Sequence, residues 1–250
     1  MDRYIEIDIL KGVAVFCMIF FHIFYYANQY GFKELEYDTQ LLKIIAKVAQ
    51  IIFITCVGIN LVISKKKSEK KKESKKMYIM KSIKRILKLA FFAICMSLFT
   101  YFVFGDKYVK FGILHFISLS SLLLFMFVDK EYIIKIIIGI LSIFYIIKKV
   151  KPYTLQYLLP SPIGFIFGLN SNYSSIDHFP IIPWMILMCI GILIGNYIVR
   201  YEPEPIIKKN ENFTLLENAG KHSLEIYAIH WLVLYAIFTF IYPKVRDKFI

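Results

Sequence analysis

The stretch EIDILKGVAVFCMIFFHIFYY, residues 6–26, indicates the fold class and also raises the question of function. Its apolar part is long enough to cross a bilayer as a helix, which takes about 20 residues. Asp8 and Lys11 nevertheless stand at one end, and His22 lies well inside. At 3.6 residues per turn, these three side chains fall on one stripe about 60° wide. Because ionisable groups at such depth nearly always face a bundle interior or a wet cavity, we expect a functional inner face.

Apolar runs of similar length recur along the chain, which has 250 residues of which 58% are hydrophobic. This pattern predicts an all-α integral membrane protein, a polytopic helical bundle of about seven transmembrane helices. The fifth predicted span is short for a crossing. The predicted spans are Ile9–Tyr30, Leu41–Ser64, Ile86–Phe104, Phe111–Val128, Ile133–Ile147, Phe179–Val199 and His222–Tyr242.

The net charge of +13 is concentrated in the segment that contains KKKSEKKKESKK, residues 65–76. Lysine-rich connections between apolar spans stay in the cytoplasm, so we expect a basic cytoplasmic loop at 65–85 and a cytoplasmic N-terminus. The loop can also contact anionic lipid headgroups, and we do not expect nucleic acid as a partner. We expect one domain over residues 1–250, in the cell membrane. Residues 151–180 are expected to form a long external loop, with a re-entrant segment or an eighth crossing as alternatives.

Further polar groups recur near the ends of later spans. In GKHSLEIYAIHW, residues 220–231, Ser223, Tyr227 and His230 share one helix face. His115 and Ser118 lie three residues apart in FGILHFISLSSLL, and SSIDHFPIIPW sets Asp177 and His178 just ahead of the sixth span. We expect these seven residues to bind the substrate. The alternative interpretations are a polar seam that joins helices and, for the last pair, a solvated loop.

The quoted segments resemble, in the same order, those of the heparan-α-glucosaminide N-acetyltransferase catalytic-domain family, a relative of the acyltransferase-three family. The opening pattern of an Asp, a basic residue followed by Gly, and a later His is met by Asp8, Lys11 and His22. The resemblance implies transfer of an acyl group, expected to be acetyl, from cytoplasmic acyl-CoA to a sugar hydroxyl or amine on the other side of the membrane. It also implies that Lys11 lies at the acyl-CoA-binding end and that His22 is catalytic.

Two departures from the family pattern bear on the substrate. Lys11 stands where Arg is commoner, which keeps the charge but loses the bidentate fork for phosphate. Members that act on glucosamine use a His in the loop after the first span, and residues 25–38 contain none, which argues against glucosamine as the acceptor.

The residue types suit acyl transfer independently of the resemblance. A neutral imidazole such as that of His22 is the usual base for deprotonating a nucleophile, and a thioester needs no metal. Ser223, Tyr227 or His115 could supply donors for the oxyanion of the tetrahedral intermediate. Direct transfer and an acyl-His intermediate both stay open. The competing hypotheses are a transporter with a proton or ion path through Lys11, His22 and His230, and a non-catalytic scaffold. A homo-oligomer is compatible with either.

Overall fold

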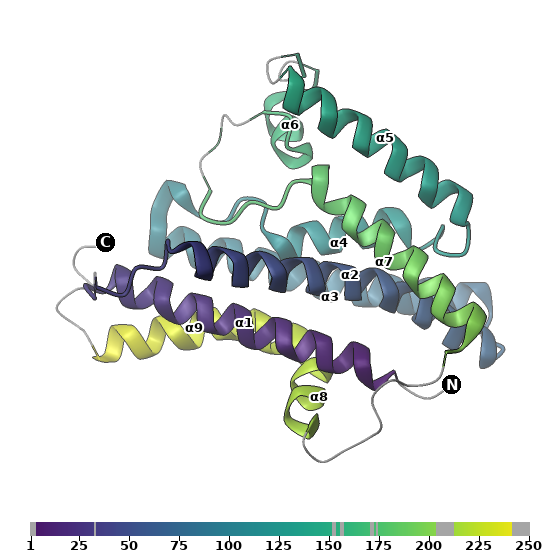
Figure 1. The fold of residues 1–250 in the computed structure, drawn as a ribbon, viewed down its shortest axis with the longest axis horizontal. Helices are drawn as coiled ribbons and strands as arrows, with labels where there is room; N and C mark the ends of the chain where they lie inside the picture. The colour runs from purple at the N-terminus through teal and green to yellow at the C-terminus, as the bar shows by residue number, and fades with distance from the viewer. Residues whose placement is uncertain are drawn as a thin grey trace. The chain divides into compact units, whose positions relative to one another are not determined.

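A computed structural model describes residues 4–32, 34–151, 154–155, 158–170, 173, 175–203 and 213–241 (Figure 1). The described residues form helices joined by short connections, and the only β-type pairing among them is an isolated bridge between Phe111 and His178. The helices are α1 (Ile5–Gln29), α2 (Gln40–Lys70), α3 (Lys75–Phe104), η1 (Gly105–Lys107), α4 (Ile113–Leu124), α5 (Glu131–Val150), α6 (Ser161–Phe167), α7 (Ile181–Tyr201), α8 (Thr214–Lys221) and α9 (Ser223–Ile241).

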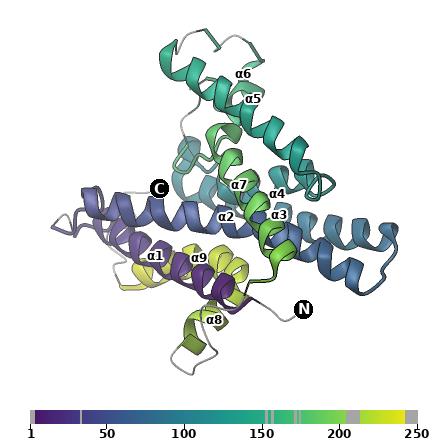
Figure 2. The ribbon, with the colours of Figure 1, turned by 45° about the vertical axis from the view of Figure 1, so that its right-hand side comes forward.

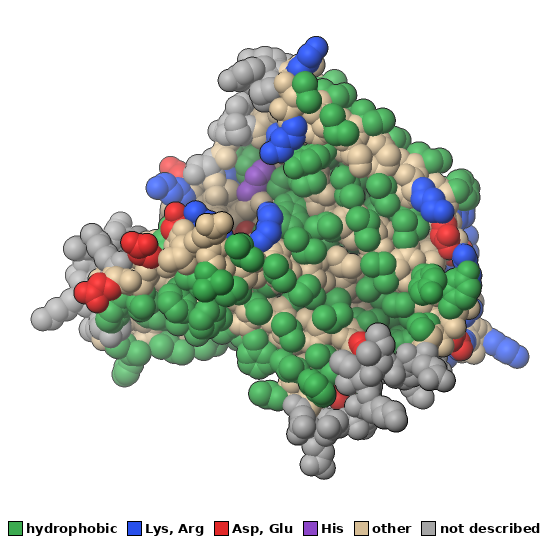
Figure 3. Space-filling view, in the orientation of Figure 1, with side chains coloured by type: hydrophobic (Ala, Val, Ile, Leu, Met, Phe, Trp, Pro, Cys, Tyr) green, Lys and Arg blue, Asp and Glu red, His purple; other side chains and the backbone are tan. Residues whose placement is uncertain are grey.

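The all-helical fold is confirmed, and each of the seven predicted spans contains a helix. Five helices in the described part of the chain, α1, α2, α3, α7 and α9, are long and apolar enough to cross a membrane. The helix α4 has only 12 residues, and every 18-residue window of α5 carries three charged side chains. The count of about seven crossings is therefore not confirmed. Hydrophobic side chains cover much of the face drawn in Figure 3, as a lipid-facing surface requires.

The predicted loop over residues 65–85 is wrong in extent. The helix α2 continues to Lys70 and α3 begins at Lys75, so only four residues connect them. Lysine favours helix nearly as well as leucine, and a polar helix end is stable once it projects into water. Ser74 caps α3 by accepting a hydrogen bond from the Met77 amide at 3.2 Å. The cytoplasmic side of this connection stays a prediction.

The described chain divides by packing into two compact units, which are taken in turn, and the prediction of one domain stays a prediction. The first comprises residues 1–56 and 204–250. Figures 1 and 2 show α9 running along α1 and the short α8 crossing the N-terminal part of α1. Glycines permit this crossing: a Cβ at Gly12 would lie 2.1 Å from the Leu216 carbonyl oxygen, and one at Gly220 only 1.7 Å from that of Asp8. Small residues let helix backbones approach closely in this way.

The second unit comprises residues 57–203. Here α3 packs against α4, α5 packs against α7, and the end of α2 meets α7 at Gly58 and Gly195. The predicted external loop at 151–180 contains α6, a helix of seven residues that ends at Gly168 in the left-handed conformation. Ser175 ties this region to the η1–α4 connection, because its hydroxyl donates to a carbonyl oxygen, that of Tyr108, at 3.1 Å. Part of 151–180 lies outside the described residues.

Candidate active site

Two histidines from helices far apart in the sequence meet in the interior of the first unit. Nε2 of His230, on α9, lies 3.1 Å from Nδ1 of His22, on α1. Each side chain is buried, with 6% of its residue surface exposed. The indole of Trp231 packs against the His22 ring with centroids 4.5 Å apart. The helical stripes of α1 and α9 therefore face each other at these imidazoles.

The surrounding carbonyls fix which ring nitrogens carry protons. Nδ1 of His230 lies 2.7 Å from the Tyr227 carbonyl oxygen, and Nδ1 of His22 lies 2.8 Å from that of Met18. Because a carbonyl oxygen only accepts, both Nδ1 atoms donate when the rings are neutral. Nε2 of His230 is then an acceptor, and the single Nδ1–H of His22 is shared between it and the Met18 carbonyl oxygen. Of the four ring nitrogens, Nε2 of His22 is the one that keeps a free lone pair, because it has no hydrogen-bond partner among the described residues.

A buried ion pair lies on the same stripe of α1, nearer its N-terminus. The Lys11 ammonium is 2.7 Å from an Asp8 carboxylate oxygen, and these side chains are 11% and 4% exposed. Lys11 and His22 are eleven residues apart on one helix, which corresponds to about 16 Å along the axis. The Gly220 backbone packs against the Asp8 backbone, so the α8 crossing fixes the position of the pair. The ion pair is therefore inside the unit and not a solvated surface contact.

The hydroxyl groups of the predicted α9 stripe are buried in the same unit. Ser223 is 7% exposed and Tyr227 is 5% exposed. The Tyr227 ring stacks on Phe53 of α2, with centroids 5.8 Å apart, and meets His230 edge-on at 5.3 Å. Six predicted site residues thus belong to one unit, namely Asp8, Lys11, His22, Ser223, Tyr227 and His230. Their catalytic and binding roles stay predictions.

Sequence reasoning did not single out the neighbours that hold the His22 ring in place. The Met18 carbonyl is one turn before it on α1, which any helix would provide. Trp231 directly follows His230, and its ring also packs against Tyr26 with centroids 5.6 Å apart. The dipeptide His-Trp inside an apolar span was the available signal for this aromatic support.

The other four predicted substrate-binding residues belong to the second unit, where their hydrogen bonds join α3 with α4 and join both α4 and α6 with the connection ahead of α7. The Gly112 amide donates to Nδ1 of His115, and Nε2 of His115 lies 3.1 Å from the Ser97 hydroxyl. The Ser118 hydroxyl donates to the Ile86 carbonyl oxygen at 3.3 Å. Both ring nitrogens of His115 are therefore already engaged within the fold, which argues for a structural contribution.

Asp177 and His178 close the connection ahead of α7. An Asp177 carboxylate oxygen accepts from the Ile113 amide at 3.4 Å, at the start of α4. Burial raises the pKa of the Asp177 carboxyl to about 7, and this hydrogen bond opposes the shift. Nε2 of His178 donates to the Phe165 carbonyl oxygen at 2.9 Å, and its ring stacks on Phe165 with centroids 3.9 Å apart. Both residues are partly buried and bonded to the backbone of neighbouring segments, and the choice between a solvated loop and a binding role stays a prediction.

The comparison with known families covers nearly the whole chain. The family model described as "Heparan-alpha-glucosaminide N-acetyltransferase, catalytic" matches residues 3–232. This range includes all ten predicted site residues. No curated protein sequence and no solved structure gives a significant match.

Proposed function

Since the chain belongs to this family of membrane N-acetyltransferases, we propose that it moves an acetyl group from acetyl-CoA to an extracytoplasmic sugar hydroxyl or amine, with His22 as the general base. The observation that carries the proposal is the hydrogen-bonded pair of His22 and His230 in a protein whose described residues include five candidate membrane spans. An apolar interior makes unpaired polar groups costly, and this pair is arranged so that one basic nitrogen is left over.

The reaction begins with the acceptor X–H, where X is oxygen or nitrogen, hydrogen-bonded to Nε2 of His22. As X attacks the thioester carbonyl carbon, its proton moves to Nε2 and the carbonyl oxygen becomes an oxyanion. The tetrahedral intermediate collapses, the carbon–sulfur bond breaks, and the departing thiolate takes the proton back from His22. The products are the acetylated acceptor and CoA–SH, and His22 is neutral again.

His230 is a positioning residue in this scheme. Its Nε2 accepts from Nδ1–H of His22 at 3.1 Å, which holds the ring and the tautomer that presents Nε2 to the acceptor. The same contact stabilises the imidazolium that forms when His22 takes the proton. Ser223 and Tyr227, on the same face of α9, are the proposed donors to the oxyanion.

Lys11 is proposed to bind the anionic part of the donor, with Asp8 holding its ammonium in place. The two side chains form an ion pair on the α1 stripe, at 2.7 Å. A Lys is a compact charge without the fork of an Arg, so it attracts a phosphate without fixing its orientation. On this proposal the N-terminal end of α1 faces the cytoplasm, where acyl-CoA is found.

The test compares four single variants of the full chain, purified in detergent and reconstituted into vesicles with acetyl-CoA and a panel of amino sugars and sugar alcohols. His22→Gln is expected to lower the transfer rate by about 10²- to 10⁴-fold, the usual contribution of a positioned base. The matched control is His222→Gln, which alters the exposed histidine just before α9 and is expected to keep the wild-type rate.

His230 separates positioning from mere packing. His230→Gln keeps an acceptor atom that can reach Nδ1–H of His22, whereas His230→Phe keeps the ring volume and removes the acceptor. We expect the Gln variant to retain more activity than the Phe variant, with the pH profile of the rate displaced only in the latter. Wild-type transfer by His22→Gln would refute the base assignment. Mass spectrometry of surface glycans and lipids, with and without the gene, would identify the acceptor by a shift of one acetyl mass.

A further inference from the structure

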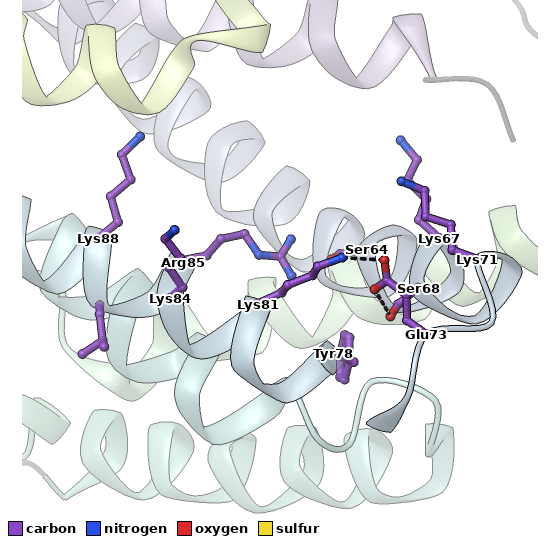
Figure 4. Close-up of a pocket in the computed structure, with 11 residues that line it drawn as sticks. Ser64, Lys67, Ser68, Lys71, Glu73, Tyr78, Lys81, Lys84, Arg85 and Lys88 are labelled. Carbon is purple, nitrogen blue, oxygen red and sulfur yellow. Dashed lines mark hydrogen bonds and ion pairs between the residues drawn. The ribbon is translucent and has the colours of Figure 1, made fainter. Parts of the chain in front are cut away.

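A basic cavity lies in the second unit, between the C-terminal end of α2 and the N-terminal half of α3 (Figure 4). Its volume is about 740 Å³, several times what one phosphate group fills. Six cationic side chains line it, contributed by both helices: Lys67, Lys71, Lys81, Lys84, Arg85 and Lys88. Figure 4 shows Lys67 and Lys71 at one end of the cavity and Lys84, Arg85 and Lys88 at the other.

The cations outnumber the acids that could neutralise them. Glu73 is the only carboxylate among the described lining residues, and it is already bound by Lys81 and by the Ser68 hydroxyl at 2.7 Å. The hydrogen bond from Lys81 lowers the pKa of the Glu73 carboxyl, so the carboxylate stays ionised and neutralises the charge of Lys81. Four cationic side chains then line the cavity without a carboxylate from its described lining, namely Lys67, Lys71, Lys84 and Arg85.

The cavity lies where both helices change from polar to apolar. The apolar part of α2 ends at Ser64, and that of α3 starts near Leu87, both of which line the cavity. From Leu87, which is 62% exposed, an exposed apolar stripe continues along α3 through Phe91 and Ile94 at helical spacing. A ligand with a multiply charged head and hydrocarbon tails matches this sequence of surfaces, whereas a water-soluble anion leaves the stripe unused.

We propose that this cavity binds the headgroup of a membrane lipid that carries two phosphates, with its acyl chains lying along the Leu87–Ile94 stripe. A headgroup with a single charge would match only one of the four cations Lys67, Lys71, Lys84 and Arg85, whereas two phosphates match more of them. The proposal does not rest on the proposed function, because none of the lining residues is a proposed catalytic or acyl-CoA-binding residue.

Native mass spectrometry of the full chain in detergent tests the proposal, with tetraoleoyl cardiolipin as the two-phosphate probe. Dioleoyl phosphatidylglycerol at equal headgroup charge and dioleoyl phosphatidylcholine are the comparison lipids. The variant Lys84→Gln/Arg85→Gln is expected to weaken cardiolipin binding about 30-fold, because each interfacial cation contributes about fivefold. A second pair from the other helix, Lys67→Gln/Lys71→Gln, is expected to act similarly, so the result does not rest on one variant's folding.

The control is Lys148→Gln/Lys149→Gln, which removes the same charge from the end of α5, outside the cavity. It is expected to change cardiolipin binding by less than about twofold. An equal loss in this control would reduce the effect to general attraction and overturn the proposal. Binding of phosphatidylglycerol as tight as that of cardiolipin would also overturn it. So would displacement of the lipid by inorganic pyrophosphate or coenzyme A at comparable concentration, which would indicate a site for soluble phosphates.

Discussion

Replacing Gly220 by Ala tests whether the α8–α1 crossing holds the Asp8–Lys11 pair in place. The added Cβ would lie 1.7 Å from the Asp8 carbonyl oxygen and 2.5 Å from its carbonyl carbon. Both are backbone atoms, so no side-chain rotation relieves the contact and one helix must move by more than about 1 Å to restore a normal separation. Overpacking of this kind costs about 1–3 kcal/mol or more, against a gain of about 1 kcal/mol from replacing Gly in a helix.

The expected net loss is about 2 kcal/mol, which lowers the melting temperature of a 250-residue chain by about 4–8 °C. The matched control is Gly139→Ala in the middle of α5, where an added Cβ would meet nothing within 4 Å. That variant gains helix propensity without a clash, so its melting temperature is expected to rise slightly.

Thermal unfolding of both variants in detergent, followed by circular dichroism, measures the difference. The proposal that the crossing also positions Lys11 adds a second expectation: Gly220→Ala should raise the KM for acetyl-CoA at temperatures where the variant is folded. A Gly220→Ala protein as stable as Gly139→Ala would refute the close contact of the two backbones. The inference about Lys11 would then have no structural support.

Three further outcomes follow from described contacts. The fold favours the protonated form of Asp177, because burial raises its pKa to about 7 from about 3.9. The contribution of this group to stability is therefore highest at low pH and falls as pH rises from about 4 to 7. Asp177→Asn should remove up to about 4 kcal/mol of this fall, measured as melting temperature against pH, with the exposed Asp106→Asn as control. Lys11→Met should destabilise by about 3–5 kcal/mol, because it removes the cationic partner of the buried Asp8 carboxylate, and a melting temperature for Asp8→Asn/Lys11→Met no higher than for Lys11→Met would contradict that coupling. Because α3 has 30 residues, or about 45 Å, cysteines placed at Lys70 and Asp106 should label from opposite sides of the membrane, and labelling from one side would disprove a crossing by α3.

Helical periodicity accounts for the part of the site that could be predicted. The angles at 3.6 residues per turn placed Asp8, Lys11 and His22 on one face of the first span, and all three are buried. The same arithmetic put Tyr227 and His230 on one face of the last span. Apolar run length also located the spans, because the bilayer imposes a minimum length on each crossing.

Contacts between helices could not be predicted from the amino-acid sequence of one protein. His22 and His230 are 208 residues apart, and nothing local determines that their helices meet at those rings. The last predicted span began at His222, one residue before the start of α9. The sequence did not show that the separate helix α8 precedes it and crosses α1 through the contact at Gly220. For His115 and Asp177, residue type favoured a binding role, yet their hydrogen bonds are used within loops that no periodicity describes.

The partner of His22 is a second histidine, His230, whereas hydrolytic triads use a carboxylate at this place. The apolar surroundings of the pair explain this difference. A carboxylate beside His22 would carry a full charge in the resting state, and burying an unpaired charge costs far more than burying a neutral ring. A neutral His230 donates its Nδ1–H to the Tyr227 carbonyl oxygen, so the resting pair of rings places no net charge next to the Trp231 indole. On the proposed mechanism, charge appears only when His22 takes a proton from the acceptor, and it is then matched by the oxyanion formed in the same step. An arrangement of this kind suits a base that must wait inside a membrane and work only when both substrates are present.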